Sequence, residues 1–159
     1  MKTLLGTVLI AALALASASA QASPPSPLIG SWAVDVEHSD IPPGARPKSV
    51  VITYSDAGSG NWRTNVDIVG ADGSKISAAG THPLDGTAAP SSGYANVDTV
   101  AARLPTPNVM VMAFYKEGMP RTTRTYTVDA DGKTMTETIV WLNINGKPEI
   151  TTNRFNRVK

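Results

Sequence analysis

The sequence contains no cysteine, and this absence removes one class of stabilising bond and one class of chemistry. Disulfide bridges, thiol nucleophiles and thiolate metal sites are excluded, so the fold depends on apolar burial and hydrogen bonds. Aromatic residues make up only 6% of the chain, and its two histidines are His38 and His82. Neither has a second ligand at the spacing of a metal motif. We predict no metal site and no cofactor, and we expect both histidines at the surface.

An excess of charge of one sign is also lacking. The chain has 14 Lys and Arg residues against 13 Asp and Glu residues. The sequence therefore lacks the excess of basic residues that would predict binding to nucleic acid or to an anionic membrane surface. The Ser91-Ser92-Gly93 stretch lacks the strand-to-helix context of a nucleophile elbow. We predict that the protein is not an enzyme; the one catalytic alternative uses Glu137 as an acid or base, for which no partner is apparent.

The first 22 residues have the pattern of a secretory signal peptide. Lys2 precedes an apolar run at Leu4–Ala16, and small residues follow. Cleavage after Ala20 and cleavage after Ala22 both fit, and the second is favoured because it leaves a c-region of ordinary length. We expect a secreted or periplasmic protein.

The apolar run is shorter than the about 18 to 20 residues that a membrane span requires. An uncleaved anchor is therefore the less favoured alternative, and no membrane span is expected after cleavage. A Pro/Ser spacer at residues 23–27 is expected to be flexible. The remainder, residues 28–159, has the length of one domain.

Turn-forming residues punctuate this domain at intervals typical of an all-β sandwich or barrel. The predicted turns are Pro42–Gly44, Asp56–Gly60, Asp72–Gly73, Asp85–Gly86, Pro105–Asn108, Glu117–Gly118, Asp131–Gly132 and Asn145–Gly146. The predicted strands are Gly30–Glu37, Lys48–Ser55, Asn61–Val69, Ser74–Thr81, Val97–Leu104, Val109–Lys116, Arg121–Val128, Lys133–Asn143 and Lys147–Val158, with a long loop at Leu84–Asn96. We predict an all-β, antiparallel up-and-down meander of about 8–9 strands that closes into a barrel.

Alternation along the strands indicates which face is buried. Trp62, Val66 and Ile68 share one face of their strand, whereas Arg63 and Asp67 lie on the other. This is the period of two that a half-buried strand shows. Trp62 is therefore expected inside the barrel.

Three local features carry a family resemblance. Gly30-Ser31-Trp32 opens the first strand, a Pro-rich turn follows at Ile41–Pro47, and Asp131-Gly132-Lys133 precedes a late strand. With the meander behind them, these features resemble the small exported lipocalin-like (calycin-type) β-barrel proteins of bacteria, over most of Leu28–Lys159. The resemblance implies a barrel with a ligand cavity but names no ligand.

The resemblance also implies a partner for the opening tryptophan. Lipocalins pair this residue with an arginine near the end of the barrel, a role that Arg154 or Arg157 would play over Trp32. The chain departs from true lipocalins because it has no disulfides and no clear helix after the barrel.

Turn lengths predict a charged row inside the barrel. A four-residue loop at Asp129–Gly132 places Arg124 opposite Glu137, and a two-residue turn at Asn145–Gly146 places Glu137 opposite Arg154. Both registers converge on Glu137. The three charged residues would then lie side by side on the inner face.

Tyr126 and Trp141 share that face, and the row carries one surplus positive charge. The two guanidinium groups would fork onto a ligand carboxylate, with the Tyr126 hydroxyl nearby. Arg124-Thr125-Tyr126 also resembles the Arg-x-Tyr arrangement with which fatty-acid-binding barrels hold a lipid headgroup. The alternative is a structural salt-bridge network with water at the end of the barrel.

Val109–Tyr115 is apolar on both faces, and the loop around Gly118 holds either two or three residues. The inward face of this strand is therefore open. We predict that Met110, Met112 and Phe114 face inward, where they suit either an adaptable cavity or ordinary core packing. The outer face would then be available for a homodimer contact.

Together these patterns predict a container for a small hydrophobic or amphipathic ligand, and a carboxylate-bearing ligand is one form of this prediction. The predicted ligand-binding residues are Trp62, Met112, Arg124, Tyr126, Glu137, Trp141 and Arg154, and Gly30 and Trp32 form the structural motif. The alternative is a protein-interaction or enzyme-inhibitor module with a solidly packed barrel, in which Leu84–Asn96 makes the contact. That loop is otherwise a mobile lid.

Overall fold

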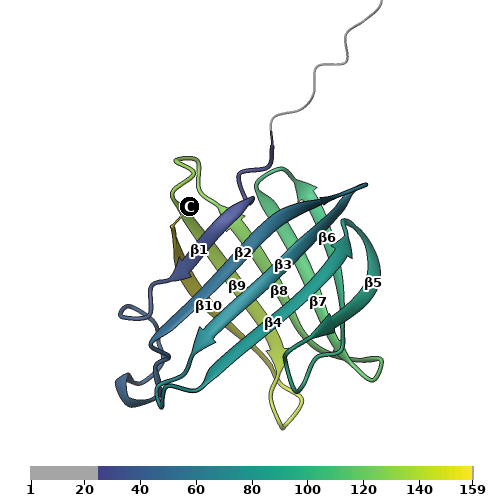
Figure 1. Ribbon diagram of the computed structural model, residues 1–159. Helices are drawn as coiled ribbons and strands as arrows, with labels where there is room; N and C mark the ends of the chain where they lie inside the picture. The colour runs from purple at the N-terminus through teal and green to yellow at the C-terminus, as the bar shows by residue number, and fades with distance from the viewer. Residues whose placement is uncertain (1–24, 159) are drawn as a thin grey trace, which may run out of the picture.

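A computed structural model describes residues 25–158 as ten antiparallel strands (Figure 1). The elements are β1 Gly30–Val34, η1 (a 3₁₀ turn) Pro43–Ala45, β2 Ser49–Gly58, β3 Asn61–Val69, β4 Lys75–Pro83, β5 Asp85–Ser92, β6 Thr99–Thr106, β7 Val109–Lys116, β8 Met119–Val128, β9 Thr134–Leu142 and β10 Pro148–Arg157. The predicted signal peptide, the cleavage near Ala22 and the start of the spacer lie outside the described residues. Within residues 25–158, no helix is both long and apolar enough to cross a membrane.

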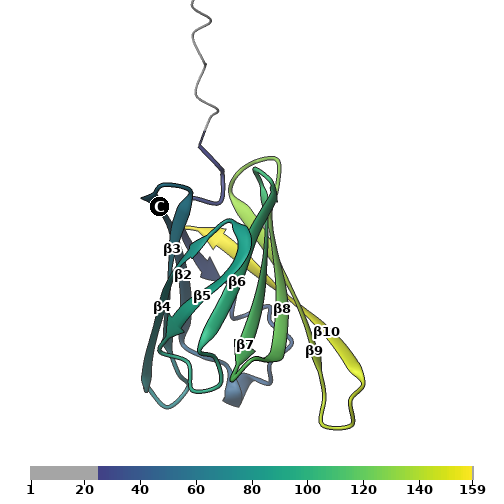
Figure 2. The ribbon, with the colours of Figure 1, turned by 90° about the vertical axis from the view of Figure 1, so that its right-hand side faces the viewer.

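The strands form one closed barrel. Each strand pairs with the next along the chain, and β1 pairs with both β2 and β10, so the sheet closes on itself. Figure 2 shows the β9–β10 hairpin diverging from the β7–β8 hairpin at one end of the barrel. Closure of a long meander removes most of its exposed strand edges.

The strand count of ten corrects the predicted 8–9, because β5 lies where the sequence predicts a loop. Its sequence, DGTAAPSS, has no apolar alternation, and most of its side chains are exposed. Pairing with β6 at four positions holds it in the sheet, whereas pairing with β4 is limited to Ala79 with Ser92 and Gly80 with Ser91. Tertiary pairing therefore forms this strand against its local composition.

Two hairpin turns use a left-handed backbone at both central positions. Ser59 and Gly60 have φ of 53° and 76°, and Glu117 and Gly118 have φ of 52° and 76°. This is the type I′ turn, whose twist matches that of the flanking strands. The turn at Gly118 thus holds two residues, and Met110, Met112 and Phe114 are buried, which confirms their predicted inward face.

The loop between β8 and β9 is longer than predicted. Val128 faces Met135, and the Asp129 N–H donates to the Thr134 carbonyl at 3.0 Å to close the connection. The register therefore shifts by two positions from the predicted one, which preserves every face because the side-chain period is two. Tyr126, and not Arg124, lies directly opposite Glu137.

The loop between β9 and β10 changes a predicted site residue. Leu142 faces Pro148, and the Asn143 side-chain oxygen accepts hydrogen bonds from the N–H groups of Asn145 (2.9 Å) and Lys147 (3.1 Å). This Asx-type loop replaces the predicted two-residue turn and shifts the register by one position. A shift of one sends alternate side chains to the opposite face.

Arg154 therefore lies opposite Thr136, outside the barrel, with a side chain that is 61% exposed. Its nearest carboxylate is Asp129, at 3.8 Å. The position opposite Glu137 belongs to Asn153. The predicted row of two arginines around one glutamate is wrong. The predicted surplus positive charge on the inner face is wrong for the same reason.

Trp32 and Arg157 close one end of the barrel. The Arg157 guanidinium lies 4.1 Å from the centre of the Trp32 ring, and the Trp32 indole N–H donates to the Leu28 carbonyl at 2.9 Å. Of the two arginines expected over Trp32, Arg157 occupies the position. Residues 26 and 27 are also hydrogen-bonded to the barrel. The Ser26 hydroxyl donates to the Pro107 carbonyl, and the Pro27 carbonyl accepts from Arg157.

Candidate functional site

An ion pair lies on the inner face of the barrel, between buried Glu137 and half-buried Arg124, whose side chain is 30% exposed. Glu137 exposes 2% of its surface, and each of its carboxylate oxygens accepts one hydrogen bond. Arg124 Nη1 donates to Oε1 at 3.1 Å, and Asn153 Nδ2 donates to Oε2 at 2.8 Å. β8, β9 and β10 thus each supply one member. Burial of a carboxylate is tolerated here because it is paired and hydrogen-bonded.

Two tyrosines pack beside this pair. The Tyr54 and Tyr126 rings meet edge to face at 5.8 Å, and both are buried. Burial raises the pKa of both hydroxyls well above the ordinary value, and the nearby Glu137 carboxylate adds to the effect. Both side chains are therefore neutral at physiological pH. The Tyr54 hydroxyl has no hydrogen-bond partner among the described residues.

Arg124 lies between Glu137 and an aromatic ring. Its guanidinium carbon is 4.9 Å from the centre of the Phe114 ring, a cation–π distance. Burial lowers the pKa of Arg124, but Tyr126 and Glu137 outweigh this effect and raise it overall, so the side chain stays charged. Its Nε is buried and has no partner among residues 25–158. One strong donor of the group is therefore unused.

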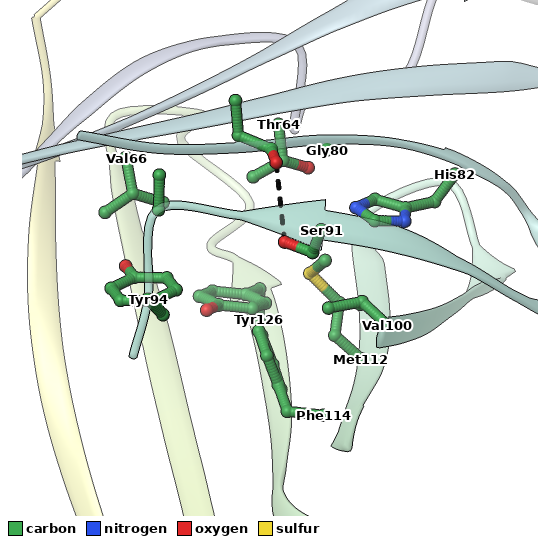
Figure 3. Close-up of a pocket in the computed structure, with 12 residues that line it drawn as sticks. Thr64, Val66, Gly80, His82, Ser91, Tyr94, Val100, Met112, Phe114 and Tyr126 are labelled. Carbon is green, nitrogen blue, oxygen red and sulfur yellow. Dashed lines mark hydrogen bonds between the residues drawn. The ribbon is translucent and has the colours of Figure 1, made fainter. Parts of the chain in front are cut away.

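A small cavity lies on the inner side of this cluster. It measures about 20 Å³ and is lined by Thr64, Val66, Ala78, Ala79, Gly80, His82, Ser91, Tyr94, Val100, Met112, Phe114 and Tyr126 (Figure 3). This space accommodates about one water molecule.

A larger pocket of about 250 Å³ lies at the mouth of the barrel. Its lining combines the loop between β5 and β6 with β7 and β8, through Tyr94, Ala95, Asn96, Val97, Phe114, Arg121, Thr122 and Arg124. Tyr94 and Phe114 line this pocket and the inner cavity alike. These two rings therefore separate the two spaces.

Gly93 brings Tyr94 into this position. Its φ is +95°, and a Cβ at Gly93 would lie 2.1 Å from the Ser77 carbonyl oxygen, so only glycine fits here. The far end of the same loop is held by Asp98, whose side chain accepts the Glu117 N–H at 2.9 Å. The predicted long lid is thus reduced to a short, anchored loop that carries Tyr94.

The comparisons with known proteins show the fold. The barrel of a mutant of the fluorescent protein UnaG matches with a TM-score of 0.54 and 12% identity, over 84% of this chain and 97% of that one. The chain shares that barrel fold. EF1p2_mFAP2b bound to DFHBI matches with a TM-score of 0.46 and 10% identity, over 82% of this chain and 94% of that one. No family model and no curated protein matches the chain.

The structure gathers four of the predicted site residues. Arg124, Tyr126 and Glu137 lie in the buried cluster, and Met112 lines the inner cavity next to Tyr126. Whether they bind a ligand stays a prediction.

The other predicted site residues lie elsewhere. Trp62 is buried, with its ring centre 6.5 Å from that of Tyr54 and the two rings tilted by 43°, but it lines none of the three pockets. Trp141 is half-buried in a separate pocket of about 380 Å³, beside Pro120 and Leu142. Arg154 points outward, as described above.

Three residues of the site are absent from the sequence-based prediction. Asn153 is missed because of the one-position register shift, and Tyr94 because a Gly/Ala/Pro/Ser segment gives no sign of facing a cavity. His82 exposes 2% of its surface, which corrects its expected place at the surface. The alternation Gly80-Thr81-His82, which places Gly80 and His82 on one face of β4, is the one signal that could have found it.

The described residues show no cluster of three or more His, Cys, Asp or Glu side chains arranged for a metal ion. His38 is exposed, and its Nδ1 lies 2.9 Å from the Asp35 carboxylate.

Proposed function

We propose that the barrel binds a small amphipathic carboxylate, with the carboxylate at Arg124 and the apolar part in the mouth pocket. One observation carries the proposal: Arg124 lines the pocket of about 250 Å³, and its buried Nε has no hydrogen-bond partner within residues 25–158. Arginine donors fork onto a carboxylate through two parallel, charge-assisted hydrogen bonds. Phe114 and Val97 supply apolar surface in the same pocket.

The charge balance limits what Arg124 does. Glu137 already neutralises it, so an anion is attracted by directed hydrogen bonds more than by net charge. The neutral Tyr126 hydroxyl adds no repulsion. The ligand is therefore expected to be selected by its headgroup geometry, and the shared fold with the UnaG barrel supports the container on which this depends.

The proposal is tested by calorimetric titration with octanoate and its neutral analogue 1-octanol. Arg124→Met should weaken octanoate by about tenfold or more, because a charged hydrogen bond is lost, and should leave 1-octanol within about twofold. Arg154→Met is the matched control, since Arg154 lies outside the barrel, and should change neither affinity. Equal loss of both ligands in Arg124→Met would refute the headgroup role of Arg124.

A packed interaction module is the second candidate, and the inner cavity of about 20 Å³ favours it. Most ligand pockets hold about 300–1,000 Å³, so the inner space as it stands is too small for one. Native mass spectrometry of the purified protein, followed by solvent extraction, separates the two. A recovered amphipathic acid supports the container; no recovered molecule, together with no octanoate binding, supports the module.

Export is part of the proposal and concerns residues 1–22 alone. A secreted or periplasmic protein would begin at Ser23 after cleavage. N-terminal sequencing of the protein recovered outside the cytoplasm tests this; an intact Met1 there would contradict it.

A further inference from the structure

His82 lines the inner cavity and takes no part in the proposed carboxylate site. Among the polar residues that line this cavity, all within the described chain, it alone has a buried side-chain atom without a hydrogen-bond partner. Its ring lies beside Gly80, Ser91 and Met112 (Figure 3), and its Nδ1 is buried with no hydrogen-bond partner among the described residues. Gly80 makes room for the ring, because a Cβ at Gly80 would lie 2.3 Å from His82 Nε2. A backbone position without a side chain thus places an imidazole on the cavity wall.

This imidazole is in its neutral form at neutral pH, since burial lowers the pKa of His82. A neutral imidazole carries one donor and one acceptor. Leaving such a buried group unpaired costs about 1–3 kcal/mol, a cost that an apolar ring of the same shape would not have. A polar atom from outside the protein, either a water molecule or a ligand group, is therefore the natural partner of His82.

The path from Arg124 to His82 passes one barrier. Arg124 lines the mouth pocket, His82 lines the inner cavity, and the Tyr94 and Phe114 rings line both. A ligand held at Arg124 would reach His82 only with the Tyr94 and Phe114 rings displaced. Arg124 and His82 would then lie at the two ends of the joined space.

We propose that His82 is a second recognition point and that the ligand is an amphipathic acid with a hydroxyl group at the end remote from its carboxylate. This inference rests on the proposed carboxylate site. A hydroxyl group both donates and accepts, so it pairs with the imidazole in either tautomer. An acid that ends in a methyl group displaces the water and leaves His82 unpaired, and such sites discriminate strongly against the analogue that lacks the hydroxyl.

The test compares ω-hydroxy acids, from 6-hydroxyhexanoate to 12-hydroxydodecanoate, with the unsubstituted acids of the same length in calorimetric titrations. At the length that spans the passage, the hydroxy acid should bind about tenfold tighter than its unsubstituted partner, although it is the more polar molecule. His82→Phe should remove this preference and retain binding of the unsubstituted acids. His38→Phe, at the exposed histidine, should leave the preference unchanged.

The two histidines provide a second readout on the unmodified chain. In a histidine-selective NMR spectrum, the hydroxy acid should shift the ring signals of His82 and leave those of His38 in place, so the inference stays testable if His82→Phe fails to fold. Unsubstituted acids that bind through Arg124 with no hydroxyl preference at any length would overturn the role of His82 and leave the carboxylate site intact. No binding of any acid would overturn both.

Discussion

Arg157 joins two backbone segments at the Trp32 ring. Its guanidinium donates to the carbonyls of Gly132 (2.6 Å), Ile29 (3.0 Å) and Pro27 while it lies over the indole. Gly132 lies in the loop before β9, and Ile29 and Pro27 lie in the segment that leads into β1. The planar fork of arginine fits such an arrangement, whereas the ammonium group of lysine does not.

Arg157→Lys should therefore lower the free energy of unfolding by about 2–3 kcal/mol, through the loss of stacking and of at least one bond to a carbonyl. Urea titration followed by tryptophan fluorescence measures the change. Arg154→Lys is the control, because Arg154 is exposed, and should stay within about 0.5 kcal/mol of the wild type. Similar values for the two variants would show that Arg157 does not fasten this end.

His82 should also affect stability at acid pH. Its pKa in the folded protein lies below the ordinary value of 6.5, because burial disfavours the charged ring. Below pH 6.5 the histidine of the unfolded chain takes up a proton while the buried ring of the folded protein stays neutral. Protonation therefore stabilises the unfolded state, and the free energy of unfolding falls as the pH drops from 6.5 toward the folded pKa. The free energy of unfolding should thus fall less steeply with acidification in His82→Phe than in the wild type.

The measurement is a set of urea titrations between about pH 7 and pH 5, the range in which an ordinary histidine titrates. His38→Phe provides the reference, since that side chain is exposed in the folded protein. Parallel curves for the wild type and His82→Phe would show that water already solvates the buried ring.

At the scale of strands, the sequence predicts faces better than registers. Alternation places Trp62 and Glu137 inside without any knowledge of pairing, and an error of two positions at the β8–β9 loop leaves Arg124 beside Glu137. An error of one position at the next loop moves Arg154 from the inner face to the outer face. The difference arises because the Asn143 side-chain oxygen accepts backbone hydrogen bonds within the loop. The Asn145-Gly146 pair alone gives no sign of these bonds.

Among the described residues, the part of β10 before Arg154 has a paired strand, β9, on one side alone. β1 pairs with β10 only at Phe155, Asn156 and Arg157, and the Asp35 N–H adds one bond to the Arg154 carbonyl at 2.8 Å. The Arg154 carbonyl points to β1. In this strand the backbone N–H and carbonyl groups of even-numbered residues therefore point toward β1, and those of odd-numbered residues point toward β9. The N–H groups of Ile150 and Thr152 therefore point to an unpaired strand edge.

Amide exchange should alternate along this segment. The N–H groups of Thr151 and Asn153 bond to β9 and should be protected, whereas those of Ile150 and Thr152 should exchange at rates close to those of an unfolded chain. Residue-resolved hydrogen exchange by NMR measures this pattern. Uniform protection from residue 150 to residue 153 would mean that another strand covers the edge in solution, as a homodimer would.

At the scale of the whole molecule, the barrel has an apolar core that is interrupted by an ion pair. Apolar side chains from almost every strand form one core around Trp32, Tyr54 and Phe155. Arg124 and Glu137 interrupt this core, although buried pairs are often no more stabilising than apolar residues of the same size. An apolar core does not need such a pair to fold, so under the proposed function the pair serves binding and not stability.

This explanation predicts a difference between single and double variants. Arg124→Met alone leaves Glu137 buried without its charged partner and should lower the free energy of unfolding by about 3–5 kcal/mol. Arg124→Met combined with Glu137→Leu removes both charges, keeps the volume similar and should restore stability to within about 1 kcal/mol of the wild type or exceed it. Thermal and urea unfolding measure both changes.

The same double variant separates folding from binding. It should retain the cooperative unfolding of the wild type and bind 1-octanol normally, because the apolar lining of the mouth pocket is unchanged, and it should lose the preference for octanoate. Asn153, half-buried beside Glu137, loses its acceptor but still reaches water. A double variant as unstable as Arg124→Met would show that the ion pair is one of the interactions that stabilise the barrel.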